Sequence, residues 1–520
     1  MLLVAVIVCA IAGQVNAALG EWVEQAKLLA SDGMVEDYFG RAVSISGNVS
    51  VVGAHRDDDN GASSGSAYVY RYDGTNWVQE AKLLASDGEH HDYFGGSVAI
   101  AGDTIVIGAY GGGASGYESG SAYVFRHNGA NWVEEAILLA SDAAEDDAFG
   151  SSVAISGVTA VIGAISDDDN GESSGSAYVF RYDSTNWVEE AKLLASDGTA
   201  EDHFGSAVSL FDDTAVIGAS GDWSDGGETG SAYVFRHNGT DWVEEAKLLA
   251  SDGEHHDSFG DAVSISGNTI VIGARGDSDN DFLSGSAYVF RLERRGWVQE
   301  VKLVASDGAW HDYFGGSVSV SGNTVVIGAH GDDDNGLDAG SAYVFWYDGL
   351  GWVEQIKLLA SDGAAEDAFG SSVSISGNTA IIGAYGDDDH RDFSGSAFIF
   401  AQCPADFEGD GDVDTADLLT LLAAWGDCPI NCPWDFNGDG YVDDLDQEIL
   451  LAHWGDCPDP PEECPWDLNG DGVVDGLDLM ELVDHYGPCP LEECPSDLDG
   501  DRDTDTADLL ALLAVWGECP

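Results

Sequence analysis

The sequence has little positive charge. Its 520 residues include 18 lysines and arginines against 95 aspartates and glutamates, which gives a formal net charge of −77 at pH 7. A surface with this balance repels the phosphates of nucleic acids and the headgroups of anionic membranes, which excludes both as partners. The same surface suits a medium rich in salt or calcium, because cations screen carboxylates and bind to them.

Long hydrophobic runs are missing beyond the N-terminus. Residues 1–17 are apolar and end in a Val-x-Ala pattern at Val15 and Ala17, although they lack the usual basic residues. This pattern predicts a signal peptide that is cleaved after Ala17. No later stretch reaches 18 apolar residues, so the sequence predicts no transmembrane helix in the mature chain. We therefore expect a secreted protein that is extracellular or located at the cell surface.

Cysteine is nearly absent from the first 402 residues, where Cys9 is the single example, and the other eight cysteines follow Gln402. They form four pairs whose members are 25 residues apart. Regularly spaced cysteines in even number are typical of disulfide bonds in a secreted chain, although spacing alone permits other connectivities. Repeat symmetry favours one bond within each pair: Cys403–Cys428, Cys432–Cys457, Cys464–Cys489 and Cys494–Cys519.

A 55-residue repeat is present seven times in residues 18–402. In one copy, Phe149-Gly150 is followed by the segments SSVAIS, TAVIGA and GSAYVF, then by a turn and Trp187. These short segments are rich in Val, Ile, Tyr and Phe and are divided by Gly, Asn and Asp, which predicts strands. Four strands per repeat, seven repeats and no helical period predict an all-β, seven-bladed β-propeller.

The two ends of this array are complementary. The N-terminal strand, predicted at 22–29, has no Phe-Gly segment before it, and the last repeat, 369–400, has no tryptophan strand after it. We expect the N-terminal strand to pair with the last blade and close the ring, because an open ring would leave long sheet edges exposed. The small residues of the Phe-Gly segment predict that it is the innermost strand. The tryptophans are expected to pack between blades.

Two connections of each repeat carry most of the acidic residues. One joins the second and third strands, as in 166–174, and the other leads into the next repeat, as in 196–202. In a four-stranded blade both connections emerge on the same face, where clustered carboxylates attract cations. The residue just after the second strand varies between repeats, and aromatic, histidine and arginine side chains are typical of binding hot spots. We therefore predict a ligand face that contains His55, Tyr110, Arg275, His330 and Tyr385.

Residues 403–520 hold four copies of a second repeat, in which a 12-residue acidic loop precedes a short apolar helix such as 417–425. Oxygen ligands at positions 1, 3, 5, 7, 9 and 12 with Gly at position 6 are the pattern of an EF-hand calcium loop. Arg502 replaces that Gly in the fourth loop, which makes it the weakest candidate. The sequence thus predicts a small α region with calcium loops and disulfide bonds. The predicted calcium ligands are Asp406, Glu408, Asp410, Asp412, Asp414 and Asp417; Asp435, Asn437, Asp439, Tyr441, Asp443 and Asp446; Asp467, Asn469, Asp471, Val473, Asp475 and Asp478; and Asp497, Asp499, Asp501, Asp503, Asp505 and Asp508.

Both repeats resemble known families. The Phe-Gly, VIGA and GSAYVF segments together resemble the FG-GAP repeats of integrin-α propellers. In that family calcium binds in a long loop between the first two strands, whereas this chain has a tight turn there, such as Gly47-Asn48, so those sites do not carry over. The loop-helix modules resemble dockerin repeats, and endings such as Trp425-Gly426 are similar to those of the GC-type variant. This second resemblance implies calcium binding and attachment to a partner such as a cohesin.

These patterns favour a secreted, calcium-binding, non-catalytic binding or adhesion protein. Its propeller would bind an extracellular protein or glycan, and its tail would attach to a cohesin-like or cell-surface partner. One alternative is a dockerin-bearing, polysaccharide-active enzyme, a glycoside hydrolase or lyase, on a propeller scaffold. Hydrolysis needs two carboxylates about 5–10 Å apart, whereas on the innermost strands only Arg41 and Asp261 depart from Gly or Ser. A second alternative is a passive extracellular structural spacer.

Overall fold

The computed structural model describes residues 22–402 except 74–75, 114–115, 225–226, 348 and 389–390. It also describes Leu422 and two pairs of very short strands in the C-terminal region: β31 (Gly426–Asp427) with β32 (Tyr441–Val442), and β33 (Gly487–Pro488) with β34 (Asp503–Thr504). The chain divides into two units, of which one is Glu24–Ala401. No helix among the described residues is long and apolar enough to cross a membrane.

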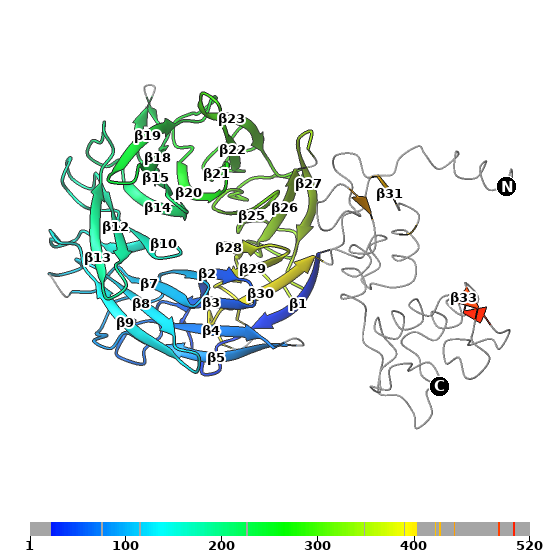
Figure 1. The fold of residues 1–520 in the computed structure, drawn as a ribbon, viewed down its shortest axis with the longest axis horizontal. Helices are drawn as coiled ribbons and strands as arrows, with labels where there is room; N and C mark the ends of the chain where they lie inside the picture. Colours follow the sequence, from blue (N-terminus) through cyan, green and yellow to red (C-terminus); the bar gives the residue numbers. More distant parts are fainter. Residues whose placement is uncertain are drawn as a thin grey trace. The chain divides into compact units, whose positions relative to one another are not determined.

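Seven four-stranded sheets surround a central axis as the blades of a propeller, which confirms the predicted all-β fold of residues 22–402 (Figure 1). We number the blades by the order of their innermost strands. Blade 1 is β2 (Phe39–Ser46), β3 (Val49–Ala54), β4 (Ser66–Tyr72) and β5 (Trp77–Leu83); blade 2 is β6 (Ser97–Ala101), β7 (Thr104–Ala109), β8 (Ser121–His127) and β9 (Trp132–Leu138); blade 3 is β10 (Phe149–Ser156), β11 (Thr159–Ala164), β12 (Ser176–Tyr182) and β13 (Trp187–Leu193); blade 4 is β14 (Phe204–Phe211), β15 (Thr214–Ala219), β18 (Ser231–His237) and β19 (Trp242–Leu248); blade 5 is β20 (Phe259–Ser266), β21 (Thr269–Ala274), β22 (Ser286–Glu293) and β23 (Gly296–Leu303); blade 6 is β24 (Ser317–Ser321), β25 (Thr324–Ala329), β26 (Ser341–Tyr347) and β27 (Trp352–Leu358); blade 7 is β28 (Phe369–Ser376), β29 (Thr379–Ala384), β30 (Ser396–Gln402) and β1 (Trp22–Leu28).

Blade 4 carries an addition that the sequence patterns did not predict. The connection between its second and third strands holds a short hairpin of β16 (Trp223–Ser224) and β17 (Gly227–Glu228). These two strands are too short to show a period-2 pattern, which explains why the repeat alone did not reveal them.

The core lies between neighbouring blades. All six residues of β11 and the first five of β12 are buried, whereas the outer strand β13 begins with alternating half-buried and exposed residues. Strands covered on both faces read as continuous apolar runs, as the TAVIGA segment does. One apolar cluster joins Val51 and Val69 of blade 1 to Ile105 and Ile107 of blade 2, and similar clusters link other neighbouring blades. The blades therefore stabilise one another face to face.

The tryptophan that opens each outer strand reaches the preceding blade. Trp187 packs against the apolar cluster between blades 2 and 3, and its indole N–H donates a hydrogen bond to Glu135 at 3.0 Å. Trp132 makes the equivalent hydrogen bond to Glu80 at 3.2 Å. The predicted packing of these tryptophans between blades is confirmed.

Each Phe-Gly pair stands at a junction of two blades. The ring of Phe149 is fully buried and meets the edge of Tyr178 at a centroid distance of 5.4 Å. Gly150 has a φ of 90°, and a Cβ there would collide with the carbonyl oxygen of Ser121 in the preceding blade. Glycine alone adopts this conformation at low cost and allows so close an approach. Phe149 also forms a parallel bridge with Gly120 of that blade.

The N-terminal strand closes the ring. β1 lies beside β30 in the sheet of blade 7, which confirms the predicted pairing (Figure 1). Phe39 and Gly395 form the same parallel bridge that joins the other neighbouring blades. Glu24 on β1 accepts hydrogen bonds from the backbone and hydroxyl groups of Ser361 in the connection after β27, at 3.0 and 2.8 Å. Leu28 is buried in the cluster that links blades 7 and 1.

Candidate functional site

The two acidic connections of a blade lie side by side. In blade 1 the backbone N–H of Arg56 donates to the carbonyl of Asp37 at 3.4 Å, and in blade 4 Gly221 donates to Asp202 at 3.2 Å. These hydrogen bonds join the loop that follows the second strand to the loop that precedes the Phe-Gly pair. The residues after the second strands therefore emerge on the face that the order of strands predicts.

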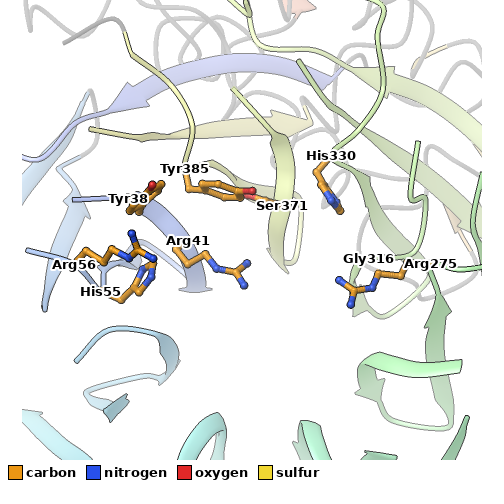
Figure 2. Close-up of a pocket in the computed structure, with 9 residues that line it drawn as sticks. All are labelled: Tyr38, Arg41, His55, Arg56, Arg275, Gly316, His330, Ser371 and Tyr385. Carbon is orange, nitrogen blue, oxygen red and sulfur yellow. The ribbon is translucent and has the colours of Figure 1, made fainter. Parts of the chain in front are cut away.

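A cavity of about 320 Å³ opens on this face beside the innermost strands of four blades (Figure 2). Its lining brings together residues that are far apart in the sequence. They are Tyr38, Arg41, His55 and Arg56 from blade 1, Arg275 from blade 5, Gly316 and His330 from blade 6, and Ser371 and Tyr385 from blade 7. Four of the five residues predicted for the ligand face, His55, Arg275, His330 and Tyr385, are among them.

The fifth predicted residue, Tyr110, is not among the residues that line the cavity. Its ring stacks on Tyr93, with centroids 5.0 Å apart and an interplanar angle of 13°. Blades 3 and 4 have Ile165 and Ser220 at the corresponding positions. We call the seven residues that follow the second strands the variable ring. In blades 1, 5, 6 and 7 these residues are histidine, arginine or tyrosine and line the cavity, whereas blades 2, 3 and 4 have no arginine or histidine there.

Two of the cavity arginines lie above aromatic rings. The guanidinium of Arg56 lies 4.9 Å from the ring centroid of Tyr38, and that of Arg41 lies 5.6 Å from the ring centroid of Tyr385. Tyr38 in turn has its ring 5.8 Å from that of His55 and 5.9 Å from that of Tyr385. A guanidinium above a ring gains cation–π attraction and keeps its N–H donors available at its edge.

The two histidines of the cavity are uncharged at neutral pH. Burial lowers the pKa of His55 to about 3, and the charges of Arg41 and Arg56 act in the same direction. Burial lowers the pKa of His330 to about 4, again with arginine charges nearby. Nδ1 of His55 is buried and has no hydrogen-bond partner among the described residues. The positive charge of the cavity therefore comes from the arginines.

Asp261 is the one carboxylate that departs from the repeat on the innermost strands. Its carboxylate lies 3.0 Å from the guanidinium of Arg275. Burial raises the pKa of Asp261, and the charges of Arg275 and Arg41 oppose that rise. The described residues that line the cavity include no carboxylate. The pair of carboxylates that glycoside hydrolysis requires is therefore not found among them.

The sequence patterns did not single out Arg56, although a signal was present. The other six repeats have Gly or Ser at its position. Gly316 and Ser371 are ordinary members of the repeat, and because both residues are small they leave space between the larger groups. Space of this kind depends on how the blades are arranged around the axis, which the sequence of one repeat does not show.

Lysine side chains lie among the aspartates of the acidic connections. In blade 6 the carboxylates of Asp307, Asp332 and Asp334 lie close enough together to hold a metal ion. The Nζ of Lys357 lies among them, 2.8, 2.7 and 2.6 Å away respectively. Lys82 of blade 1 has three aspartates around it in the same way. In these blades a lysine ammonium group lies where we expected clustered carboxylates to attract a cation.

The predicted tail sites and the predicted signal peptide at residues 1–17 lie outside the described residues. The exceptions are the backbones of Tyr441 and Asp503, both at position 7 of their predicted calcium loops. Tyr441 belongs to β32, which pairs with β31, and Asp503 belongs to β34, which pairs with β33. The predicted disulfide bonds, the other calcium ligands and the helices of residues 403–520 stay predictions.

Seven blades, each with a Phe-Gly pair at or before the start of the innermost strand and a Gly-Ala end on the second, define a propeller of FG-GAP type. A comparison with protein families matches the FG-GAP repeat seven times, and the chain belongs to this family. The matched residues are 22–70, 77–125, 132–180, 187–235, 242–290, 297–345 and 352–400. A dockerin type I domain matches residues 433–486, which span the second and third predicted calcium loops. The comparison with curated proteins gave no match.

Proposed function

We propose that this chain is a secreted, non-catalytic binding or adhesion protein whose propeller binds an extracellular glycan or protein in the cavity. The observation that carries this proposal is that the cavity gathers positions at which the seven repeats differ. A single ligand site needs unlike groups in one place, whereas repeated positions supply the same group seven times. His55, Arg275, His330 and Tyr385 are residue types that dominate binding energies when they are partly buried.

We propose that the tail, residues 403–520, attaches the protein to a partner. Dockerin domains bind calcium and cohesins, and residues 433–486 match this domain. We propose that the predicted loops of residues 403–520 bind calcium, since their carboxylate and amide oxygens are the donors that this hard cation prefers. The tail then joins the propeller to a cohesin-like or cell-surface partner outside the cell, in keeping with the predicted signal peptide.

The main alternative is an enzyme that acts on a polysaccharide. The cavity is lined by arginine, histidine, tyrosine and small residues, with no carboxylate among the described lining residues. Cleavage of a glycosidic bond commonly uses one carboxyl group as the acid and another as the base or nucleophile. An enzyme would release product from a bound glycan, whereas a binding protein leaves the glycan intact, so product analysis after incubation separates the two.

A glycan array tests the proposal. The calcium-loaded mature protein should bind a subset of glycans, and the Arg275→Ala/Tyr385→Ala variant should lose that binding while circular dichroism shows that the propeller is still folded. The Tyr110→Ala variant is the matched control, because Tyr110 belongs to the variable ring but does not line the cavity. Normal binding by the double variant would show that the cavity is not the binding site.

A further inference from the structure

Most cations of this acidic chain belong to ion pairs that recur from blade to blade. All six lysines contact a buried aspartate: Lys27, Lys82, Lys192, Lys247, Lys302 and Lys357. Five arginines on third strands each contact a glutamate on the adjacent outer strand: Arg71, Arg126, Arg181, Arg236 and Arg291. Because these pairs repeat around the ring, they belong to the architecture of the blade rather than to one ligand site.

Three of the remaining arginines break the repeat and meet at the cavity. Arg41, Arg56 and Arg275 stand at positions where no other repeat has arginine, and all three line the cavity. Figure 2 shows Arg41 and Arg56 of blade 1 and Arg275 of blade 5, with the guanidinium groups of Arg41 and Arg275 directed toward each other across the opening. The sequence has 95 acids, yet it places three of its non-repeated arginines together at one cavity.

Two of the three arginines have no acidic partner. Arg275 is paired with Asp261 at 3.0 Å. Arg41 and Arg56 lie above tyrosine rings and have no carboxylate within 4.0 Å among the described residues. Like charges gathered in a partly buried cavity repel one another unless an anion lies between them. With both histidines neutral, three guanidinium groups and one carboxylate leave the cavity with an excess of positive charge.

Guanidinium chemistry indicates which anions fit. Its planar fork of N–H donors matches carboxylate and sulfate oxygens, and such charge-assisted hydrogen bonds are about twice as strong as neutral ones. The aromatic rings of Tyr38 and Tyr385 offer flat apolar surfaces beside the donors, against which the C–H face of a sugar ring can pack. An anionic sugar would use both features together.

We propose, on the basis of the binding function above, that the cavity recognises a glycan through a terminal sugar that carries a carboxylate or sulfate group. Arg41 and Arg56 bind the anionic group, Arg275 adds a third donor, and Tyr385 packs against the ring. A single terminal residue fits better than a continuous polyanion, because a chain with a net charge of −77 repels long polyanions. The cavity volume of about 320 Å³ also lies at the small end of ligand pockets.

The test uses calcium-loaded full-length protein on an array of matched glycans whose terminal sugar carries a carboxylate, a sulfate or only hydroxyl groups. We expect at least tenfold tighter binding to one or both acidic series than to the neutral series. Arg41→Gln/Arg56→Gln should remove this preference. Arg71→Gln/Arg126→Gln, which removes the same charge from repeated ion pairs, should retain it. Comparison of the carboxylate and sulfate series identifies the anionic group.

The outcomes separate this inference from the proposed function. Equal binding of acidic and neutral glycans that is lost in Arg275→Ala/Tyr385→Ala would overturn the anionic preference but leave the cavity as a glycan site. An unchanged preference in Arg41→Gln/Arg56→Gln would also overturn it. Triglutamate is titrated to test an acidic peptide as the ligand. If the protein bound triglutamate but none of the glycans, the proposed ligand would be an acidic protein segment and not a sugar. No binding to any array member or to triglutamate would overturn this inference and, with it, the proposal that the cavity binds a glycan.

Discussion

The ammonium group of Lys192 on β13 lies 2.8 Å from the carboxylate of Asp167, whose side chain is 5% exposed. The hydroxyl of Tyr178 donates to the same oxygen at 2.9 Å. The corresponding positions of blade 2 are Ile137 and Gly112, so both charges are absent there together. A buried carboxylate that loses its cation destabilises a fold, whereas loss of both charges costs little. From blade 2 we infer that the lysine and the aspartate act as one unit.

Replacing Lys192 alone should be more harmful than replacing the pair. Lys192→Ile leaves Asp167 buried without its ammonium partner and should lower the free energy of unfolding by about 3 kcal/mol. Lys192→Ile/Asp167→Gly, which reproduces blade 2, should recover more than half of that loss. Urea unfolding of the propeller measures both variants in one thermodynamic cycle.

A matched control is available on the same blade. Arg181→Ala removes a cation from the more exposed pair with Glu190 and should cost less than about 1 kcal/mol. If Lys192→Ile and the double variant are equally unstable, the two charges are not coupled and the comparison with blade 2 is misleading.

A second set of aspartates responds to pH in the opposite sense from Asp32, Asp142 and Asp307, whose carboxylates contact lysines. Burial raises the pKa to about 6 in Asp37, Asp257, Asp312 and Asp367, although each accepts a backbone hydrogen bond. Because the folded pKa exceeds the ordinary value of 3.8, the folded state binds protons more tightly than the unfolded state between these limits. Stability from these groups is therefore present below about pH 4 and is lost as the pH rises through 6.

The lysine-bound aspartates behave oppositely. Burial opposes ionisation of Asp142, but its hydrogen bonds with Lys192 and Tyr178 outweigh burial and lower its pKa. The same holds for Asp32 and Asp307. Their contribution is present above pH 3.8 and is lost as the pH falls through the lowered values. The two sets together place maximum stability on the acidic side of neutrality, between pH 4 and 6.

The melting temperature of the propeller should therefore rise by several degrees between pH 7 and pH 5 and fall again below about pH 4. Asp257→Asn/Asp312→Asn should flatten the rise. Asp103→Asn/Asp213→Asn removes two exposed carboxylates and should preserve the rise, which separates the buried groups from the general relief of charge repulsion. Calorimetry across this pH range measures the melting temperature. A steady decline of the melting temperature from pH 7 to pH 4 would contradict the raised pKa values of the buried aspartates.

The sequence was sufficient for the architecture because the fold repeats. A constant 55-residue spacing fixes the number of blades, and the missing Phe-Gly segment before Trp22 predicts the closure by β1. Side-chain partners were harder to predict. Lys82 meets Asp32 from a different connection, 50 residues away, and no local pattern indicates that contact. Tyr110 and His330 occupy equivalent positions and stack alike on Tyr93 and Tyr313, yet only His330 lines the cavity, and this difference depends on the surroundings that other blades provide.

Because β1 closes the ring, we expect it to contribute as much to the free energy of unfolding as the outer strand of any other blade. Leu28 of β1 and Leu193 of β13 hold equivalent positions and are equally buried, at 3% exposure. Leu28→Ala and Leu193→Ala should each lower the free energy of unfolding by about 2–4 kcal/mol, because each leaves a cavity between blades. Denaturant unfolding compares them directly. A normal stability for Leu28→Ala beside an unstable Leu193→Ala would mean that β1 does not close the ring in solution.

The tail is expected to need calcium and disulfide bonds together. Each predicted bond closes a loop of 25 residues, which in the chain-entropy treatment stabilises a module by about 3–4 kcal/mol. A module of this size is too small for a self-sufficient core, so metal-binding free energy must contribute to folding.

Oxidised residues 403–520 should therefore gain helical circular dichroism on addition of calcium and lose it with EDTA, whereas the reduced segment should respond weakly. Asp439→Asn/Asp471→Asn removes a position-5 carboxylate from the second and third loops and should shift the calcium midpoint to higher concentration. Asp501→Asn in the fourth loop, where Arg502 replaces the glycine, should have a smaller effect because that loop is expected to bind calcium weakly from the outset. A spectrum that is the same with calcium and with EDTA would show that the acidic loops do not fold around the metal.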